Sequence, residues 1–317
     1  MVNLSNRLCG IVILNYKTYF DTCECIDSVF NHESNDNFHI YIVDNCSKDG
    51  SLEQLVERYS NEKRVSIIPL EKNLGFSGGN NKGIDAAIKD GAKYVFLLNS
   101  DIVLLNDAIS KMMLSLEEKD QIVAVGPSVV NLSNDYSQYA KKGLTFKSFV
   151  LDKKIVRSFF KKKAYRERYY NYKKEVLRFE FPGMASGCCL GFKASFLSSI
   201  NYLDDHIFLY YEEDSLAHII KKQHLLTVVD NSAKVVHKEG ASTKKIAKST
   251  IVFTRFHRWI SSYYVLKKYA SISRFSSFII YHMYRFIWTL SSIFNKEFFK
   301  MRKPFIKQIR KIKRNEL

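Results

Sequence analysis

The first 125 residues alternate between short apolar runs and segments whose apolar residues recur at helical spacing. An apolar run of about four to eight residues is typical of a buried strand, and helical spacing is typical of an amphipathic helix. The expected strands are Cys9–Leu14, Phe38–Val43, Val65–Pro69, Tyr94–Leu98 and Ile122–Val125. The expected helices are Thr18–Phe30, Ser51–Tyr59, Ser77–Lys89 and Asn106–Leu116. This alternation predicts an α/β fold with a mostly parallel central sheet flanked by helices.

Polar residues stand where three of the expected strands end. Asn15 follows the first strand, Asp44 follows the second, and Asp101 comes shortly after the fourth. Ligands of open α/β sheets bind beyond the carboxyl ends of the parallel strands. The sequence therefore predicts a ligand site that is built around these three side chains.

After residue 130 the pattern changes. Residues 131–180 are basic and rich in tyrosine, and we expect a variable, mobile insert there. The elements expected beyond it are strands at Gly187–Phe192, Leu225–Val229 and Lys234–Val236 and a helix within Phe208–Lys222. From about residue 249, aromatic and aliphatic residues alternate with Lys and Arg in a helical pattern. The sequence thus predicts an α/β unit over residues 1–245 and a helical, basic module over residues 246–317.

Positive charge is concentrated in two regions of the chain. The 317 residues include 49 Lys and Arg against 32 Asp and Glu, a formal net charge of +17. Residues 241–317 hold 18 basic and 2 acidic side chains, residues 141–174 hold 13 basic and 2 acidic side chains, and the rest is net acidic. Such regions suit phosphate-rich partners, which are nucleic acid, anionic lipid or a diphosphate substrate. A solvated, charged surface is the alternative.

The cysteines and the hydropathy of the chain indicate the cellular compartment of the protein. The six cysteines show no CxxC spacing, so we expect reduced thiols in a cytoplasmic protein. Because a strand is expected to begin at Cys9, we expect no signal peptide before it. The longest apolar stretch, Phe275–Ile293, is interrupted by Tyr281, His282 and Arg285, so we expect no membrane-spanning helix.

Two of the polar strand ends have residue types that suit a nucleotide. Asp101, with Asn99 beside it, can bind Mg²⁺ or Mn²⁺, which favour a few carboxylates together with phosphate oxygens. A turn or helix cap is the alternative for an isolated strand-end Asp. Asp44 opens a turn-rich stretch and can accept a hydrogen bond from a base N–H, unless Ser47 or Asp49 merely caps the next helix.

A glycine-rich segment, Asn73–Gly83, leads into the third expected helix. Close backbone approach and a helix N-terminus suit a nucleotide or a phosphate. The segment is neither a Walker loop nor a GxGxxG motif, so by itself it is weak evidence.

Two further clusters could carry the chemistry. Glu212, Glu213 and Asp214 follow the aromatic run Phe208–Tyr211. Apolar surroundings raise the pKa of a carboxyl group and suit a general base, although three acids could also serve the helix dipole. His237 ends an expected strand and could complete a metal site with Asp101, or it could be a structural histidine.

In their order and spacing these motifs resemble the family 2 glycosyltransferases of the GT-A fold. The similar branch builds bacterial surface polysaccharides and includes rhamnosyltransferases. The matching segments are Val12–Tyr16, Val43–Gly50, Asn73–Gly83, Leu97–Asp101, Gly187-Cys188, Tyr210–Leu216 and Val236–Ser242. Together they cover roughly residues 8–245.

The resemblance implies a role for each matching residue. The donor-binding residues would be Asn15, Tyr16, Asp44, Asn73, Gly75, Asn80, Asn99 and Ser100. Asp101 would be the last acid of the DxD-type metal motif, in which Asn99 replaces the first acid, and His237 would bind the same ion. The register places the catalytic base at Glu213, with Glu212 and Asp214 as alternatives. Gly187, Cys188 and Tyr211 would lie on the acceptor side.

The implied reaction is an inverting, metal-dependent transfer of a hexosyl or deoxyhexosyl group. The donor would be a UDP- or dTDP-sugar, and the acceptor a hydroxyl of a glycan or of a glycan linked to polyprenyl diphosphate. The basic, aromatic C-terminal module predicts docking on the anionic cytoplasmic face of a membrane. The alternative is that its helices pack on the catalytic domain or form a homodimer interface. The competing classes are a nucleic-acid-binding protein, for which no motif is recognisable, a sugar nucleotidyltransferase and an inactive family member.

Overall fold

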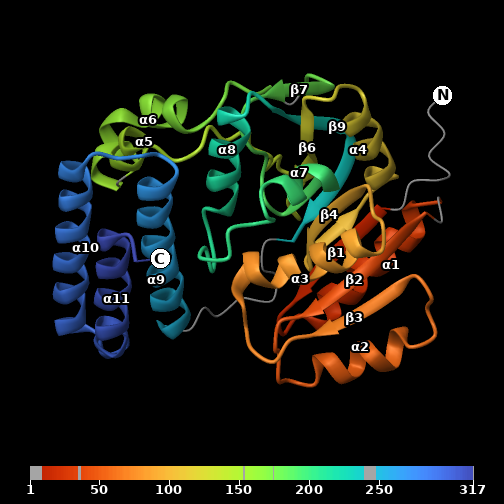
Figure 1. The fold of residues 1–317 in the computed structure, drawn as a ribbon, viewed down its shortest axis with the longest axis horizontal. Coiled ribbons are helices and arrows are strands. Elements are labelled where there is room, and N and C mark those ends of the chain that lie inside the picture. The colour runs from red at the N-terminus through yellow and green to blue at the C-terminus, as the bar shows by residue number, and fades with distance from the viewer. Residues whose placement is uncertain (1–8, 35–36, 153, 174, 239–247, 317) are drawn as a thin grey trace.

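The computed structural model describes residues 9–34, 37–152, 154–173, 175–238 and 248–316. In this part of the chain a nine-stranded sheet forms the centre of the larger half of the molecule (Figure 1). The strands are β1 (Cys9–Asn15), β2 (Phe38–Asp44), β3 (Val65–Pro69), β4 (Tyr94–Asn99), β5 (Ile102–Leu104), β6 (Ile122–Val130), β7 (Arg178–Phe181), β8 (Cys189–Lys193) and β9 (Leu226–His237). Their order is β3-β2-β1-β4-β8-β6-β9-β5, with β7 beside β9. Only β5, β7 and β8 run against the others, which confirms the expected α/β fold with a mostly parallel sheet.

Helices cover both faces of the sheet because successive side chains of each strand point to opposite faces. Ile11 and Ile13 of β1 join one apolar cluster, and Val12 joins the other. The first cluster is covered by α1 (Tyr19–His32), α2 (Ser51–Tyr59) and α4 (Ala108–Glu117). The second is covered by α3 (Gly75–Lys89), α7 (Ala194–Ser199) and α8 (Glu212–Lys222). The sheet is therefore buried on both faces, and its strand ends remain as the place for a ligand.

The strand prediction was wrong beyond residue 225. One strand, β9, replaces the two short strands expected there. Its pairing with β6 shifts in register, so that Pro127 lies opposite Asp230 and Ser128 lies opposite Lys234. A bulge absorbs the polar residues that looked like a break in the strand. Because β9 is continuous, it carries His237 to the same edge of the sheet as Asp101.

The region 131–180, expected as a mobile insert, contains regular structure. It includes α5 (Phe146–Leu151), α6 (Lys154–Arg168) and strand β7 of the sheet. Thr145 begins α5 with a reciprocal capping box to Ser148, which satisfies two helix-end groups. Phe149 then packs into an apolar cluster with the C-terminal helices. This region therefore connects the sheet to the C-terminal module.

The C-terminal module is helical, as expected. Helices α9 (Lys248–Lys268), α10 (Arg274–Phe294) and α11 (Lys296–Arg314) stand beside one another on the left in Figure 1. They share a core of their own around Tyr263, Tyr284, Trp288 and Phe305. The expected domain boundary at residues 245 and 246 lies outside the described residues. Within the described part of the chain, no helix combines the length and the apolar character that crossing a bilayer requires.

Candidate active site

The ends of β1 and β2 are joined by a buried polar network. Asn15 and Asp44 lie opposite each other in the sheet, and Asn15 Nδ2 donates to Asp44 Oδ1 at 2.7 Å. Ser47 donates to the same carboxylate from its hydroxyl at 2.5 Å and from its backbone N–H at 3.1 Å. Asp44 is only 2% exposed. The carboxylate predicted to face the base is thus held by three donors at the rim of the sheet.

The glycine-rich segment begins α3 against this network. Asn45 receives a hydrogen bond from the backbone N–H of Leu74 at 2.8 Å and donates to Asn73 and to the carbonyl of Gly75. Gly75 has a positive φ of 74°, and a Cβ there would lie 2.3 Å from the carbonyl oxygen of Phe208. Only glycine allows this backbone conformation and this close approach. Asn80 is 1% exposed and donates to the carbonyl of Phe76, so its amide stabilises α3 from within.

A cavity of about 760 Å³ opens at this corner. Its lining comes from three parts of the molecule, one of which is the loop before α8 with Phe208 and Leu209. Leu14, Tyr16, Asn45, Asn73, Gly75 and Phe76 line it from the sheet side, and Ser249, Thr250, Val252, Phe253, Glu297 and Met301 line it from α9 and α11. A drug-sized ligand fills a pocket of about 300–1,000 Å³. The C-terminal module therefore forms one wall of the cavity at the predicted donor-binding residues.

Asp101 and His237 meet at the edge of the sheet between β4 and β9. Their atoms Oδ1 and Nε2 are 3.3 Å apart, and both side chains are mostly buried. Burial lowers the pKa of His237, but hydrogen bonds to Asp101 and Cys188 outweigh burial and raise that pKa to about 10. The imidazole is therefore protonated at neutral pH in this arrangement and forms an ion pair with Asp101.

The same two side chains fit a divalent cation. Two neighbouring ligand atoms that are each about 2.1 Å from one Mg²⁺ lie about 3 Å apart. The separation between Asp101 and His237 is close to that value, and one carboxylate with one imidazole leaves coordination positions for phosphate oxygens and water. Binding an ion would release the imidazole proton, because a metal ligand must be unprotonated.

The residues before Asp101 support this edge of the sheet. The backbone N–H of Asn99 donates to the carbonyl of Cys188 at 2.9 Å. Ser100 accepts a hydrogen bond from Thr18 at 3.0 Å, and Thr18 also donates to Asn15. The two strand ends that the sequence predicted as donor-binding are thereby linked to each other.

Glu213 lies in the first turn of α8 and faces the backbone of Gly187. Its Oε1 accepts hydrogen bonds from the N–H of Gly187 at 3.0 Å and from Lys141 Nζ at 2.8 Å. A Cβ at position 187 would lie 2.6 Å from that oxygen, so glycine permits the contact. Burial raises the pKa of Glu213, but Lys141 outweighs burial and lowers it below its usual range. The carboxylate is therefore ionised at neutral pH.

Glu212 has the opposite environment. Its Oε2 is buried and has no hydrogen-bond partner among the described residues. Burial, reinforced by the neighbouring charge of Glu213, raises the pKa of Glu212 to about 8. Two adjacent carboxyl groups with pKa values pushed apart are a common feature of acid–base sites.

Asp214 forms a buried, bidentate ion pair with Arg168 at the end of α6. Both side chains are almost completely buried. Because the guanidinium occupies both carboxylate oxygens, this acid is committed to holding α6 against α8.

The segment Gly187-Cys188 brings the two clusters together. Gly187 contacts Glu213, and the next residue, Cys188, hydrogen-bonds His237 and accepts from Asn99. On the other side of Glu213, a cavity of about 490 Å³ is lined by Tyr210, Tyr211, Glu212, Glu213 and Asp214 and by Lys141, Arg168, Tyr169, Arg258, Trp259 and Tyr284. Tyr211 has a positive φ of 71° just before α8 begins. The acidic residues thus lie between the strand ends and a second cavity.

Sequence reasoning missed several residues of this arrangement. Lys141 and Arg168 come from a region without a motif, so no local signal pointed to them. Glu297 and Phe253 line the first cavity from helices to which the sequence assigned no residue of the site. Asn45 could have been identified from the sequence, because it follows Asp44 in a segment that resembles the family. The segment Glu239–Ser242 of the resemblance lies outside the described residues.

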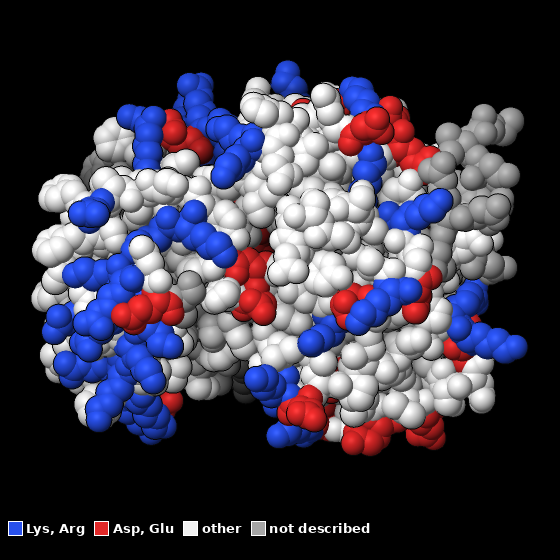
Figure 2. Space-filling model, in the orientation of Figure 1, with Lys and Arg blue, Asp and Glu red and all other residues white. Residues whose placement is uncertain are grey.

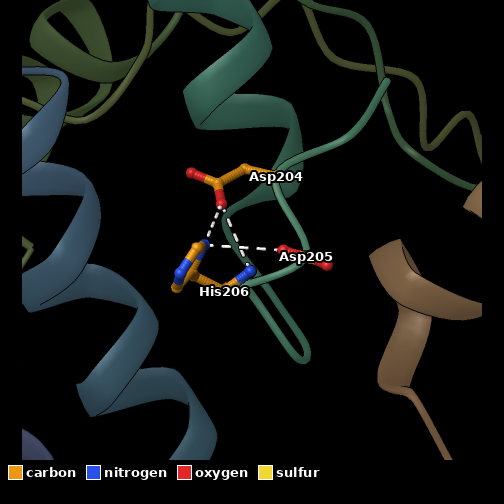
Figure 3. Close-up of side chains that lie close together, drawn as sticks. All are labelled: Asp204, Asp205 and His206. Carbon is orange, nitrogen blue, oxygen red and sulfur yellow. Dashed lines mark hydrogen bonds and ion pairs between the residues drawn. The ribbon is translucent and has the colours of Figure 1, made fainter. Parts of the chain in front are cut away.

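A second acidic cluster, Asp204, Asp205 and His206, lies in the loop before α8 (Figure 3). His206 Nδ1 is 3.0 Å from Asp204 Oδ1, and Asp204 Oδ2 accepts hydrogen bonds at 2.7–2.9 Å from three side chains of the α9 region. The donors are Tyr264, Lys268 and Tyr269. Although burial raises the pKa of Asp204, bonds from Lys268 and Tyr269 outweigh it and lower that pKa. This carboxylate tethers the loop to the C-terminal helices.

The parallel strands, the polar network at their carboxyl ends and the pair Asp101–His237 define a class of protein. This is the GT-A architecture of nucleotide-sugar transferases. The sequence model described as glycosyl transferase family 2 matches residues 11–200, which is more than half of the chain. The chain therefore belongs to glycosyl transferase family 2.

Curated relatives agree with this assignment over shorter segments. The chain is 26% identical over 121 residues to glycosyltransferase GlyG of Streptococcus pneumoniae, which covers 38% of this chain and 39% of that protein. It is 29% identical over 87 residues to the putative teichuronic acid biosynthesis glycosyltransferase TuaG of Bacillus subtilis, which covers 27% of this chain and 33% of that protein. The matches thus span little more than a third of the length of these curated relatives.

The fold is also similar to a solved structure. A crystal structure of GalNAc-T7 with UDP, GalNAc and Mn²⁺ aligns with a TM-score of 0.55 and 11% sequence identity. The alignment covers 81% of this chain and 50% of that chain. At this identity the likeness shows the GT-A fold alone.

Proposed function

We propose that this chain is an inverting glycosyltransferase that moves a hexosyl or deoxyhexosyl group from a nucleotide sugar to an acceptor hydroxyl. The observation that carries the proposal is the segment Gly187-Cys188, which joins the ionised carboxylate of Glu213 to the pair Asp101–His237. A proton acceptor and a diphosphate-binding edge on opposite sides of one short segment are what a single displacement requires. The sheet-side cavity at Tyr16 and Asn73 offers space for the nucleoside.

Glu213 is the proposed general base. It is ionised at neutral pH, whereas Glu212 keeps its proton up to about pH 8 and Asp214 is committed to Arg168. In the reaction, the acceptor O–H bond breaks as its proton moves to Glu213. The oxygen forms the new bond at the anomeric carbon, and the nucleoside diphosphate leaves with the old bonding electrons. Lys141 holds the carboxylate in place before the acceptor arrives.

The donor side is proposed for the residues at the strand ends. Asp44 and Asn15 would position the nucleoside, Asn73 and Gly75 would line the donor, and Asn80 would support them from within α3. A UDP- or dTDP-sugar is the proposed donor. Mg²⁺ or Mn²⁺ held by Asp101 and His237 would supply electrostatic stabilisation of the departing diphosphate. The presence of UDP and Mn²⁺ in the GalNAc-T7 structure supports both proposals.

The proposed setting is bacterial surface polysaccharide synthesis on the cytoplasmic side of the membrane. The name of TuaG, which refers to teichuronic acid biosynthesis, supports this setting. The acceptor would be a glycan, free or linked to polyprenyl diphosphate, that enters the cavity beside Tyr211.

Docking on an anionic membrane is proposed for the C-terminal module. Helix α10 exposes an apolar stripe that includes Phe275, Phe286, Ile293 and Phe294, each at least two-thirds exposed. Helix α11 packs beside it and carries a run of Lys and Arg, and Figure 2 shows such side chains gathered over the C-terminal helices. Apolar side chains beside basic ones are typical of interfacial helices. A homodimer through the same stripe is the alternative.

Substitution of the proposed base tests the reaction. General-base catalysis contributes about 10²–10⁴-fold to rate, so Glu213→Gln is expected to lower kcat by at least about 100-fold. Gln keeps the shape of the side chain, and donor affinity is expected to stay within about threefold of wild type. Turnover would be followed by mass spectrometry with a panel of nucleotide sugars and a glycan acceptor, and donor affinity by calorimetry. Near-normal turnover of Glu213→Gln would overturn the assignment.

Asp101→Ala tests the metal role. The affinity of the full chain for UDP would be titrated with and without Mn²⁺, so that the measurement does not depend on turnover. In wild type, Mn²⁺ is expected to increase affinity at least about tenfold, because the ion neutralises diphosphate charge. In Asp101→Ala this increase is expected to disappear. The assignment fails if the variant keeps the full effect of Mn²⁺.

A further inference from the structure

A third cavity, of about 710 Å³, lies where the end of α6 meets residue 142. Its walls carry four cationic side chains and two tyrosines. These are Lys142, Lys161, Lys162, Arg166, Tyr165 and Tyr169. Among the described residues, no Asp or Glu contributes to the lining.

Three of the four positive charges of this cavity lack an acidic partner within the described residues, and the fourth, Lys142, interacts electrostatically with Glu167. Lys162 and Arg166 are exposed and lie four positions apart on α6, and like charges at that spacing destabilise a helix. No ion pair of Lys161, Lys162 or Arg166 occurs among the described residues. The nearby acid Glu167 is paired with Lys147. Lys142 Nζ donates to the carbonyl of Arg166 at 2.7 Å, which fixes its cation at the end of the helix. A bound anion would relieve this repulsion.

The cavity adjoins the proposed acceptor cavity. Tyr169 lines both of them. Lys141, which binds Glu213, is followed directly by Lys142, whose ammonium group lies 5.2 Å from the ring centre of Tyr170. An acceptor whose hydroxyl reaches Glu213 could therefore place a neighbouring group between Lys142 and Arg166.

We propose that this cavity binds a phosphate or diphosphate group of the acceptor. The inference rests on the proposed function, since it names the chemistry of the acceptor for that same site. Lys and Arg supply charge-assisted hydrogen bonds to phosphate oxygens, and the flanking Tyr165 and Tyr169 provide aromatic surface for the sugar or lipid next to them. Two sources share this chemistry, a glycan diphosphate and a phospholipid headgroup, and the structure favours the first because Tyr169 lines both this cavity and the acidic one.

Inorganic pyrophosphate is the probe for the first experiment, with the full chain and EDTA to keep the metal site empty. We expect wild type to bind pyrophosphate and Lys162→Glu/Arg166→Glu to bind it at least about tenfold more weakly, because hydrogen bonds to charged groups are worth about that factor or more. The matched control is Lys303→Glu/Lys307→Glu on α11, which reverses two exposed charges at the same spacing. It is expected to bind pyrophosphate like wild type.

Two further measurements separate the sources. With an acceptor that carries a diphosphate, Lys162→Glu/Arg166→Glu is expected to raise the KM for acceptor about tenfold and to leave donor hydrolysis by water unchanged. Equal pyrophosphate affinity in wild type and variant would overturn the proposal. So would an unchanged acceptor KM together with lost binding to anionic vesicles, which would point to a headgroup. If wild type turned over no nucleotide sugar, the proposed function would fail, while pyrophosphate binding would still report on the cavity.

Discussion

At the scale of single residues, three adjacent acids in one sequence run acquire three different environments. Glu213 is ionised beside Lys141, Glu212 has a buried Oε2 with no hydrogen-bond partner among the described residues, and Asp214 is paired with Arg168. The environments differ because consecutive side chains of α8 point about 100° apart around the helix axis and therefore contact different neighbours. Three carboxyl groups that look alike in the sequence therefore become an ionised carboxylate, a neutral acid and a structural anchor.

The pKa of Glu212 predicts a pH dependence of stability. In the folded state this carboxyl keeps its proton up to about pH 8, whereas the ordinary pKa of a glutamate side chain, which stands for the unfolded chain, is 4.5. Between these values the folded state binds more protons than the unfolded state, so the free energy of unfolding falls as pH rises. Glu212→Gln removes this titration and is expected to be more stable than wild type at pH 8, by up to a few kcal/mol.

Chemical unfolding at several pH values between 5 and 8.5 measures the effect. The matched control is Glu53→Gln at an exposed position in the first turn of α2, which measures the effect of the same substitution outside the site. An identical slope in Glu212→Gln and wild type would contradict the assigned environment.

At the scale of elements, the insert and the acidic helix form one unit. The ion pair of Arg168 and Asp214 joins α6 to α8, and Lys141 joins the segment before α5 to Glu213. The proposed catalytic acids are thereby positioned by a region that shares no motif with them. The insert is expected to be indispensable for activity for this reason, although its charge pattern resembles a solvated surface.

Removing one partner of the buried pair predicts a large loss of stability. Arg168→Met leaves Asp214 buried without its cation, and Asp214→Leu leaves the guanidinium unpaired, at an expected cost of about 3–5 kcal/mol each. The double variant places two apolar side chains together and is expected to recover much of that loss. Guanidinium unfolding followed by tryptophan fluorescence measures all three. Strictly additive losses would mean that the pair does not act as a unit.

At the scale of the whole molecule, charge and apolar surface are unevenly divided. Basic side chains gather over the C-terminal helices on the left of Figure 2, while acidic and basic side chains are interspersed on the right. The C-terminal module also lines the first cavity with Phe253 and Glu297. Since the same module would face the membrane and close the donor site, its deletion would confuse two roles, and point variants are the better test.

Vesicle binding tests the membrane proposal with the full chain. Each Lys or Arg near an anionic surface is worth about 1 kcal/mol, so Lys303→Glu/Lys307→Glu is expected to weaken binding to phosphatidylserine vesicles at least about tenfold. Phe286→Ser/Phe294→Ser is expected to weaken it as well, through lost apolar burial. Lys221→Glu/Lys222→Glu at the end of α8 is the matched control. Unchanged vesicle binding, together with a dimer that the Phe variants dissociate, would favour the homodimer.

The sequence by itself determined the α/β order of elements, the polar strand ends and the motif register. These depend on local periodicity and on neighbours in the chain, which the sequence displays directly. The helical nature of the C-terminal region followed from the same periodicity. The continuity of β9 did not, because pairing with β6 carries the strand across polar residues that locally look like a loop.

Only the tertiary structure decided which of the three acids is paired with Lys141 and which with Arg168. It also decided that α9 and α11 line a cavity at the edge of the sheet. These are contacts between segments 26 to more than 200 residues apart, and each depends on burial and direction rather than on spacing. The pKa values of Glu212, Glu213 and His237 follow from those contacts. The sequence thus shows which groups are available for the chemistry, and folding sets the charge that each one carries.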